Sequence, residues 1–464
     1  MDKPLNAKPF NEFYAELQRA ELAQYASRPE TRVRSDAAFA EQKQHLLGLY
    51  AGVNAAHSFV DAGGQVFDCI PADQQPALKK HGGKLAAPPA VPTVPKAPGV
   101  PAAPTRGADA AALVPARRDA FGNEMSCPAG TVPIRRVTLE ELTRFETLGH
   151  FLRKHGHPRQ RRLRRAPQGL LPEAQLGTPH EYAHAYQSVS NLGGHSVMGI
   201  WHPSVTSSQI FSLSQHWYVA QGPWGVQTVE VGWQVYPSSY GHDKPVLFTY
   251  WTADEYHSTG SYSTTAGDFV QYGANHPVGM AIESWSEVGG SQVELEITVM
   301  LHDGNWWIFV GGTDDAHAVG YYPTSLYKGG PMATGATEID YGGETVGNGS
   351  YPPMGSGEFA ERGYKFAAYQ RNIYYIASDS TTAVAQLTSS EDWPDSYTIQ
   401  VGQSTDWGEY FYYGGPGSGT ASPRGESPAT AASGRLTMTA PCGVKLENLS
   451  IRDAAALLRQ LSVR

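Results

Sequence analysis

The chain has 464 residues and a formal net charge of -9 at pH 7, with a pI near 6.0. This length, well above the roughly 150 residues of an average domain, allows one large core or two folded units. The acidic balance excludes a global field that attracts nucleic acid, and no stretch reaches the roughly 20 apolar residues of a membrane span. Only 17% of the residues are charged, whereas 50 are Gly and 25 are Tyr, which favours a mainly β body.

The N-terminal part predicts helices. From about Asn11 to Val60, apolar residues recur at helical spacing, and we expect two helices in a segment covering residues 1–86. Met1 to Tyr25 contain no apolar core of the roughly 7 to 15 residues that a secretory signal needs. The expected localisation is therefore the cytoplasm, or the exterior by an unconventional route.

A proline-dominated run follows at residues 87–105 and is interpreted as a linker, because proline favours extended conformations over packed structure. In the next segment, residues 106–179, Thr138 precedes Glu141 at capping-box spacing and predicts one helix that continues through Leu148 and Phe151. The helix leads into a basic run, Arg159 to Arg165, which we interpret as a solvated, protease-sensitive loop.

The sequence HEYAH, from His180 to His184, formally matches a zinc-protease pattern and could form one helical turn. Zinc needs a third ligand, for which His195 is the candidate, and we expect no metal site here. Only three cysteines occur, none with zinc-ligand spacing. A disulfide between Cys69 and Cys127 is one option that the sequence leaves open.

From His180 onward, short aromatic and β-branched runs alternate with turn residues, which predicts a sandwich of antiparallel strands over residues 180–415. Residues 416–464 are expected to form a flexible tail with a short amphipathic helix beginning near Ser450.

Several stretches resemble the neprosin family, and the match extends from about Gly64 to Gly417. In the N-terminal part they are GQVFDCIPADQQPAL and CPAGTVPIRR. In the C-terminal part they include FSLSQHWY, VEVGWQVYP, LFTYWTAD, GNWWIFVGG, VGYYPTSLY, IDYGGETV and WGEYFYYGGPG, in the order found in the family. The resemblance implies a mainly β protein, with an antiparallel β-sandwich peptidase domain after a smaller, partly helical propeptide. Plant members of the family commonly carry two cysteines where this chain has Ser261 and Ala266, so the body is expected to fold without a disulfide.

The resemblance also implies a glutamic endopeptidase, active in acid and cleaving after proline, with the paired catalytic glutamates at Glu230 and Glu344. Such a pair suits amide hydrolysis, because mutual repulsion keeps one carboxyl protonated while the other activates water. No cofactor is expected, and the expected partner is a proline-containing peptide or protein. We expect a monomer that binds neither nucleic acid nor membrane.

Strand alternation places Glu230 on one face with Gln234, opposite an apolar face that begins with Val229 and Val231. Gln234 is therefore a candidate for holding the water or the oxyanion, and Tyr250 and Trp251 are candidates for stacking on a substrate proline. Gly342 and Gly343, just before Glu344, are expected to leave room for an extended substrate.

Two other classes of function remain open at this point. A glycoside hydrolase also uses two carboxylates in an aromatic cleft. A non-catalytic carbohydrate- or protein-binding sandwich would use the same Trp and Tyr residues. The helical segment, proline linker and basic loop fit a zymogen, with acid weakening charge pairs between the basic loop and the acidic body.

Overall fold

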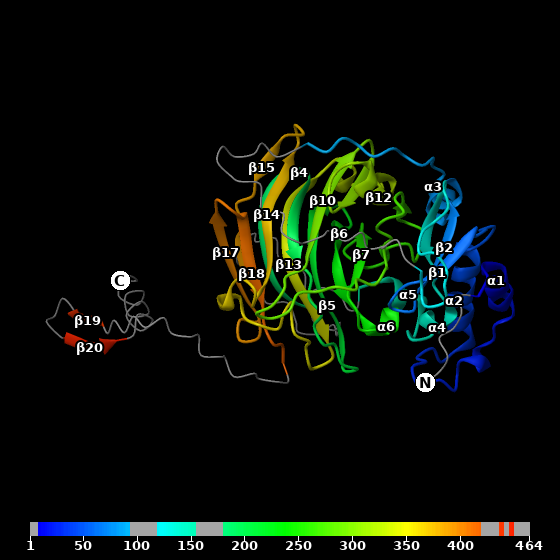
Figure 1. The fold of residues 1–464 in the computed structure, drawn as a ribbon, viewed down its shortest axis with the longest axis horizontal. Coiled ribbons are helices and arrows are strands. Elements are labelled where there is room, and N and C mark those ends of the chain that lie inside the picture. The colour runs from blue at the N-terminus through cyan, green and yellow to red at the C-terminus, as the bar shows by residue number, and fades with distance from the viewer. Residues whose placement is uncertain (1–7, 93–117, 155–179, 419–435, 440–444, 450–464) are drawn as a thin grey trace. The chain divides into compact units, whose positions relative to one another are not determined.

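The computed structural model describes residues 8–92, 118–154, 180–418, 436–439 and 445–449 (Figure 1). The chain divides into two compact units, Met1–Ala421 and Ser422–Arg464, which are treated separately. The proline-rich run beyond residue 92, the basic run at Arg159 to Arg165 and the helix expected near Ser450 lie outside the described residues. No helix among the described residues is long and apolar enough to span a membrane.

The N-terminal region, residues 8–154, combines helices with a three-stranded antiparallel sheet, β1-β2-β3. Its helices are α1 (Phe10–Arg19), η1 (Leu22–Gln24), α2 (Asp36–Leu49), η2 (Ala72–Gln74), α3 (Pro76–His81), α4 (Leu139–Leu142) and α5 (Leu148–Leu152). Its strands are β1 (His57–Val60), β2 (Val66–Pro71) and β3 (Thr131–Arg135). The two helices expected before Val60 are thus confirmed as α1 and α2. A disulfide joins Cys69 of β2 to Cys127.

The single helix expected from Thr138 is wrong, because the structure breaks it into α4 and α5. The predicted cap is present, since the Thr138 hydroxyl accepts a hydrogen bond from the Glu141 amide at 3.2 Å. A second threonine, Thr147, caps α5 by accepting from the His150 amide at 3.2 Å. Threonine competes for backbone hydrogen bonds and so favours caps over helix interiors. The break also lets Phe145 and Phe151 pack edge to face.

The body, residues 180–418, is built from antiparallel strands as predicted, beginning at His180 and ending at Gly414. Its strands are β4 (His180–Gly199), β5 (Gln209–Gly222), β6 (Gly225–Val235), β7 (Val246–Thr252), β8 (Ser261–Tyr262), β9 (Val270–Gln271), β10 (Glu294–His302), β11 (Asn305–Val310), β12 (Ala318–Pro323), β13 (Ala336–Gly347), β14 (Ala368–Ala377), β15 (Thr382–Val384), β16 (Thr388–Glu391), β17 (Thr398–Ser404) and β18 (Gly408–Gly414). Short helices connect them: α6 (Pro237–Tyr240), η3 (Asp315–His317), η4 (Thr324–Tyr327), η5 (Pro331–Ala333) and η6 (Ala360–Arg362).

These strands form one curled sheet in the order β8-β7-β6-β5-β13-β4-β10-β11-β12-β9, with the remaining strands joined through β4 and β14. The long strand β4 makes the turn between the two layers. Its first part pairs with β13 and its last part, from Gly193, pairs with β10. Gly193 has φ +129, and a Cβ there would lie 2.0 Å from the Val299 carbonyl oxygen, so only glycine fits this bend.

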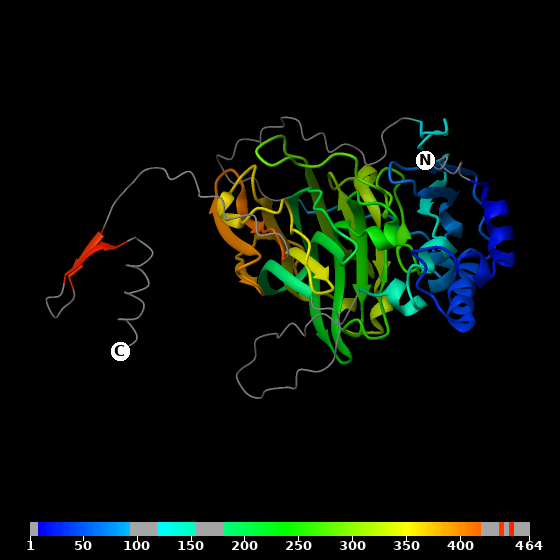
Figure 2. The ribbon, with the colours of Figure 1, turned by 90° about the horizontal axis from the view of Figure 1, so that it is seen from below.

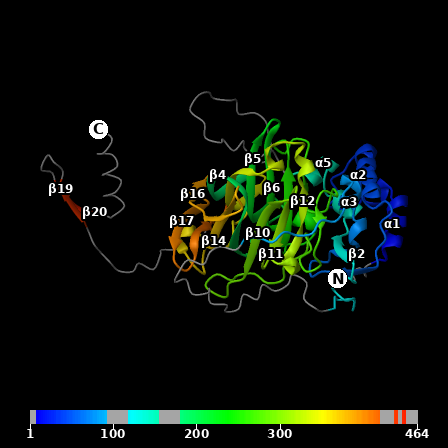
Figure 3. The same ribbon diagram turned by 90° about the horizontal axis from the view of Figure 1, so that it is seen from above.

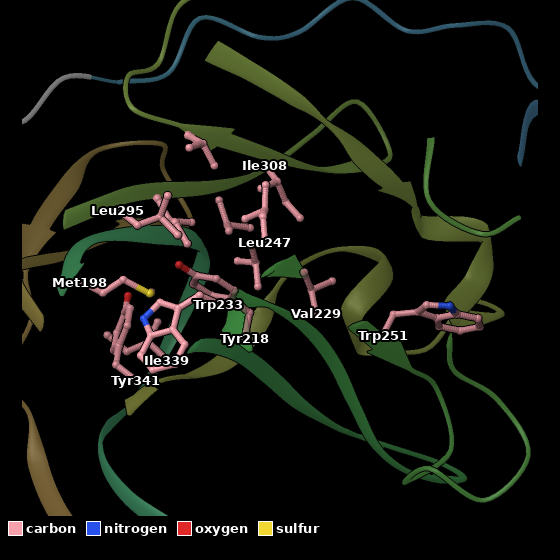
Figure 4. Packing of buried hydrophobic residues seen from close by; sticks show 14 of the residues in the cluster. Met198, Tyr218, Val229, Trp233, Leu247, Trp251, Leu295, Ile308, Ile339 and Tyr341 are labelled. Atoms are coloured by element: carbon pink, nitrogen blue, oxygen red, sulfur yellow. The ribbon is translucent and has the colours of Figure 1, made fainter. Parts of the chain in front are cut away.

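Between the two layers lies the main core (Figure 4). Val229, Val231 and Trp233 of β6 face it from one side, and strands β10 and β11 supply Val299 and Ile308 from the other. The predicted apolar face of β6 is therefore confirmed, and the opposite face, which carries Glu230, is left to the outside of this core.

The N-terminal region packs against this outer face, beside strands β5 to β7 (Figures 1, 2 and 3). One apolar cluster contains buried side chains from both parts and is called the shared cluster. Its members from the N-terminal region include Phe10, Leu17, Phe39, Leu46, Phe145 and Phe151, and those from the body include Phe211, Leu213, Tyr236, Phe248, Tyr250 and Tyr262. The two parts thus bury apolar surface against each other.

The second unit contains an antiparallel hairpin of β19 (Leu436–Thr439) and β20 (Lys445–Leu449). The sequence predicted only a helix in this tail. Pairing between these strands is set by their partners rather than by local periodicity, which explains why the pattern did not indicate it.

Candidate active site

Strands β6 and β13 lie on either side of β5 and bring Glu230 and Glu344 to the same face of the sheet. Glu344 is opposite Leu213 in register and Glu230 is opposite Trp217. Leu213 and Trp217 are four residues apart on one strand, so the side chains of their partners point the same way. Both carboxylates are fully buried.

One ammonium group lies against both carboxylates. Lys154, two residues after α5, places Nζ 2.5 Å from Glu230 Oε2 and 2.9 Å from Glu344 Oε2. Burial favours the neutral amine, but the two carboxylates raise the pKa of Lys154 above its usual value. The lysine is therefore charged, and one Oε2 atom from each glutamate faces the same point.

The remaining contacts of Glu344 come mostly from N–H donors. Its Oε1 lies 2.5 Å from His180 Nδ1 and 3.4 Å from the Tyr182 hydroxyl, and the Gln215 amide donates to Oε2 at 3.0 Å. Burial alone would raise the pKa of this carboxyl, but Lys154 and His180 lower it to about 2. Glu344 is thus held ionised.

Glu230 has different neighbours. Its Oε1 accepts hydrogen bonds from the Thr228 hydroxyl at 2.8 Å and from the Tyr256 hydroxyl at 2.7 Å. Tyr250 is opposite Glu230 in register, and burial raises the pKa of its phenol. Apart from Lys154 on Oε2, the donors to this carboxyl among the described residues are therefore hydroxyl groups, both on Oε1.

The HEYAH sequence is not a helical turn, because it forms the first part of β4. Its side chains alternate faces, so His180 and His184 both point toward the face that carries Glu344. His180 contacts Glu344, whereas His184 Nδ1 lies 3.0 Å from Asp340 Oδ1. In the described part of the chain, no group of three or more His, Cys, Asp or Glu residues is arranged to hold a metal ion.

The structure separates the candidate substrate residues. Tyr250 lies at the pair, where its hydroxyl accepts from the Lys154 backbone N–H at 3.4 Å. Gln234 is on the same face of β6, buried and opposite Leu213. Trp251 points the other way, into the main core, where its indole N–H donates to Asp268 at 3.2 Å (Figure 4).

Packing inside the protein accounts for both of the paired glycines. A Cβ on Gly343 would meet Met354 and Tyr413 inside the body, so this glycine serves core packing rather than substrate approach. A Cβ on Gly342 would lie 2.5 Å from the Ala183 carbonyl oxygen of the neighbouring strand. Close pairing of β13 with β4 therefore explains this second glycine.

Sequence reasoning missed most residues that contact the pair. They are Lys154, His180, Tyr182, Gln215, Thr228 and Tyr256. His180 lies in a motif that indicated zinc chemistry. Thr228 could have been found by extending the polar face of β6 two residues before Glu230.

Comparison with known proteins supports the sequence resemblance. The family model for the neprosin activation peptide matches residues 58–186, and the model for neprosin matches residues 208–416.

Among solved structures, the chain is similar to scytalido-glutamic peptidase with a transition state analog inhibitor, at 10% identity over 51% of this chain and 98% of that chain, with a TM-score of 0.30. The complex of the same peptidase with a peptide based transition state analog gives 11% identity, coverages of 51% and 97%, and a TM-score of 0.30. SCP-B of the Eqolisin family, in complex with the tripeptide Ala-Ile-His, gives 9% identity, coverages of 51% and 97%, and a TM-score of 0.29.

An activation peptide therefore precedes a neprosin domain in this chain, in the order expected of a peptidase precursor, and the chain belongs to the neprosin family.

Proposed function

We propose that this peptidase precursor is the zymogen of a glutamic endopeptidase in which Glu230 and Glu344 hydrolyse the peptide bond through an activated water. The supporting observation is that two buried carboxylates, on the strands either side of β5, each direct one oxygen toward a single point, now occupied by the Lys154 ammonium. In the active enzyme, water and the scissile amide take that place.

The surroundings of the two carboxyls favour different roles. N–H donors from His180 and Gln215 remain on Glu344 when Lys154 leaves, and such donors stabilise an ionised carboxylate. Glu344 is therefore the general base toward water. The Glu230 Oε1 atom accepts from two hydroxyls, an arrangement that a neutral carboxyl also satisfies, with its proton on Oε2. Glu230 is then the general acid toward the departing nitrogen.

Lys154 keeps the precursor inactive, because its ammonium neutralises both carboxylates and fills the position of the reacting groups. With its pKa lowered to about 2, Glu344 stays ionised in mild acid. Protonation of this carboxyl is thus not how acid frees the site, and activation requires the chain to be cut after Lys154. Acid incubation is expected to yield a product starting between about Gly156 and Tyr182. A start no later than His180 keeps this histidine on Glu344, as the role of Glu344 as general base requires.

A preference for proline before the cleaved bond is part of the proposal and rests on the family resemblance. Aromatic rings near the pair provide surfaces on which a proline ring can stack, since the Lys154 ammonium lies 5.8 Å from the ring centroids of both Trp217 and Tyr250. Trp217 and Tyr250, rather than Trp251, are the residues to test. Trp217→Ala should raise KM for a proline peptide more than for its alanine counterpart.

The central experiment compares Glu230→Gln and Glu344→Gln with wild type, using quenched peptides with and without proline at pH 3 to 7 and mass spectrometry of the products. Each variant should remain folded and lose turnover by at least about a thousandfold, because both carboxyls take part in one step. Glu296→Gln is the matched control. This carboxylate lies on β10 and pairs with His195 of β4 rather than with the catalytic pair. A fully active single variant would contradict the pairing, and release of reducing sugar without peptide cleavage would favour a glycosidase.

A further inference from the structure

Building on the proposed function, we infer that Tyr256 is a positioning residue of this active site, and that the loop after β7 exists to hold its hydroxyl on Glu230. The loop, residues 253–260, belongs to none of the motifs from which the catalytic pair was identified. The contacts of this loop place the Tyr256 hydroxyl on Glu230.

The hydroxyl of Tyr256 donates to Glu230 Oε1 at 2.7 Å, and the ring is 8% exposed. The Thr228 hydroxyl donates to the same oxygen at 2.8 Å. Neither hydroxyl donates to Oε2, the atom that faces Lys154. Two donors on one oxygen therefore fix the carboxyl plane and leave the other oxygen for chemistry.

Backbone strain indicates that this contact is selected rather than incidental. Glu255 and Tyr256 have φ +58 and +63, consecutive non-glycine residues in the left-handed region, which costs energy. Such conformations persist only where surrounding contacts impose them, and they gather at functional sites.

The contacts that impose the conformation start from both ends of the loop. The Thr252 hydroxyl accepts from the Tyr256 amide at 2.9 Å, and the Glu255 amide donates to the Val226 carbonyl of β6 at 2.8 Å. Asp254 accepts from the amide and the hydroxyl of Thr259, at 3.1 Å and 2.6 Å to the same oxygen, and also from Ser258. The loop is thus tied to the strand that carries Glu230.

The function of Tyr256 follows from the geometry. Without its hydrogen bond, the Glu230 carboxyl rotates more freely and its Oε2 proton is less often aimed at the leaving nitrogen. Orientation of this kind affects the chemical step more than substrate binding. Burial raises the pKa of the Tyr256 phenol well above its usual value, so the hydroxyl remains a donor throughout the working range.

The test measures kcat and KM for Tyr256→Phe, Thr228→Val and the double variant. All full-length chains are cut with trypsin in the basic run, the trypsin is blocked, and the samples are acidified, so that processing does not depend on their own activity. Tyr256→Phe keeps the ring and should lower kcat about 10- to 100-fold, with KM within about twofold. Because Thr228 and Tyr256 act on one oxygen, the double variant should lose less than the product of the two single losses.

The folded fraction of each variant gives a second readout. Circular dichroism and the melting temperature are measured beside the kinetics, because a positioning role lowers kcat of the folded enzyme, whereas a merely structural role lowers the fraction that is folded. Tyr262→Phe is the control, because this buried tyrosine contacts the Tyr250 ring but its hydroxyl interacts with Gln234 rather than with Glu230.

Unchanged kcat in Tyr256→Phe, or a fall in kcat that a smaller folded fraction fully explains, would overturn the inference. Multiplicative losses in the double variant would do the same. Glu230→Gln, measured in parallel, separates this failure from failure of the catalytic pair: an active Glu230→Gln would refute the pair itself.

Discussion

At the scale of single residues, Lys154 forms buried ion pairs with both Glu230 and Glu344, so its loss should change the stability of the fold. Removing one partner of a buried ion pair leaves an uncompensated charge, at a cost of about 3–5 kcal/mol. We predict that Lys154→Met lowers the free energy of unfolding of the full-length chain by that amount at pH 7. The lowered pKa of Glu344 and the raised pKa of Lys154 mean that the pair stabilises the fold between about pH 4.5 and 10, and less as pH falls toward 2.

Denaturant unfolding at pH 7 and pH 4 measures this prediction, with mass spectrometry to verify that the chain is intact. The deficit of Lys154→Met should shrink in acid, because a carboxyl left without its cation takes up a proton. Lys8→Met is the control, since its pair with Glu16 is exposed and contributes about 1 kcal/mol or less. An equal deficit at both pH values would show that lost packing, rather than lost charge, causes the effect.

The sequence indicated the glutamates but not their partners, for a physical reason. Glu230 lies on an alternating strand, at a position that resembles one in the family, and both signals are visible in one sequence. Lys154 is 190 residues from Glu344, and the two meet only because the N-terminal region folds onto the body. The contact of Gln215 with Glu344 could not be predicted for a similar reason, because the position of an amide on a strand does not show which residues lie beside it in the fold.

At the scale of elements, the disulfide joins Cys69 of β2 to Cys127 at a sequence separation of 58, and the loop that it closes includes the proline-rich run. Closing a loop of this length in the unfolded chain stabilises the folded state by about 4 kcal/mol. We predict that Cys69→Ala with Cys127→Ala, or a reductant, destabilises the N-terminal region by that amount. The body has no cysteine between residues 128 and 441, so the processed enzyme should unfold at the same denaturant concentration with or without reductant.

Separate denaturant titrations of the full-length and processed chains measure both parts of this prediction. A shift of the processed chain in reductant, or no shift of the full-length chain, would contradict it.

Elements were predictable where local pattern and tertiary partner agree. Strand β6 alternates valines with polar residues and was identified with its correct faces. The sequence placed the beginning of β4 in the β body but left one helical turn open for its short His-Glu-Tyr-Ala-His pattern, and pairing with β13 from His180 onward makes it a strand. The prediction of one helix after Thr138 was wrong, because the apolar spacing continues past Thr147 although this residue caps a new helix, α5.

At the scale of the whole molecule, the N-terminal region is held on the body by the shared cluster and by polar contacts of opposite pH dependence. Lys80 pairs with Asp268 of the body at 2.6 Å. Burial favours protonated Asp268, but His81 and Lys80 lower its pKa, so this contact stabilises the complex at neutral pH and is lost in acid. Asp61 accepts from the Ala281 amide, and burial raises its pKa to about 6, so its contribution grows as pH falls.

We therefore predict that a chain cut in the basic run stays associated at pH 7 and separates near pH 3, as measured by size-exclusion chromatography across this range. Asp268→Asn should weaken association at pH 7 about two- to tenfold, a modest effect because the partner Lys80 is half-exposed and its pair is screened. It should also reduce the difference between pH 7 and pH 3, because the lowered pKa of Asp268 keeps its contribution until the pH falls below about 3.8. Asp314→Asn removes the same charge from an exposed pair with His317. Both residues belong to the body, so this change should leave association unchanged. Separation that is equally complete at pH 7 and pH 3 would mean that only the covalent connection through the basic run retains the N-terminal region. Tighter association in acid would mean that Asp61 outweighs Asp268, and that release depends on proteolysis of the N-terminal region itself.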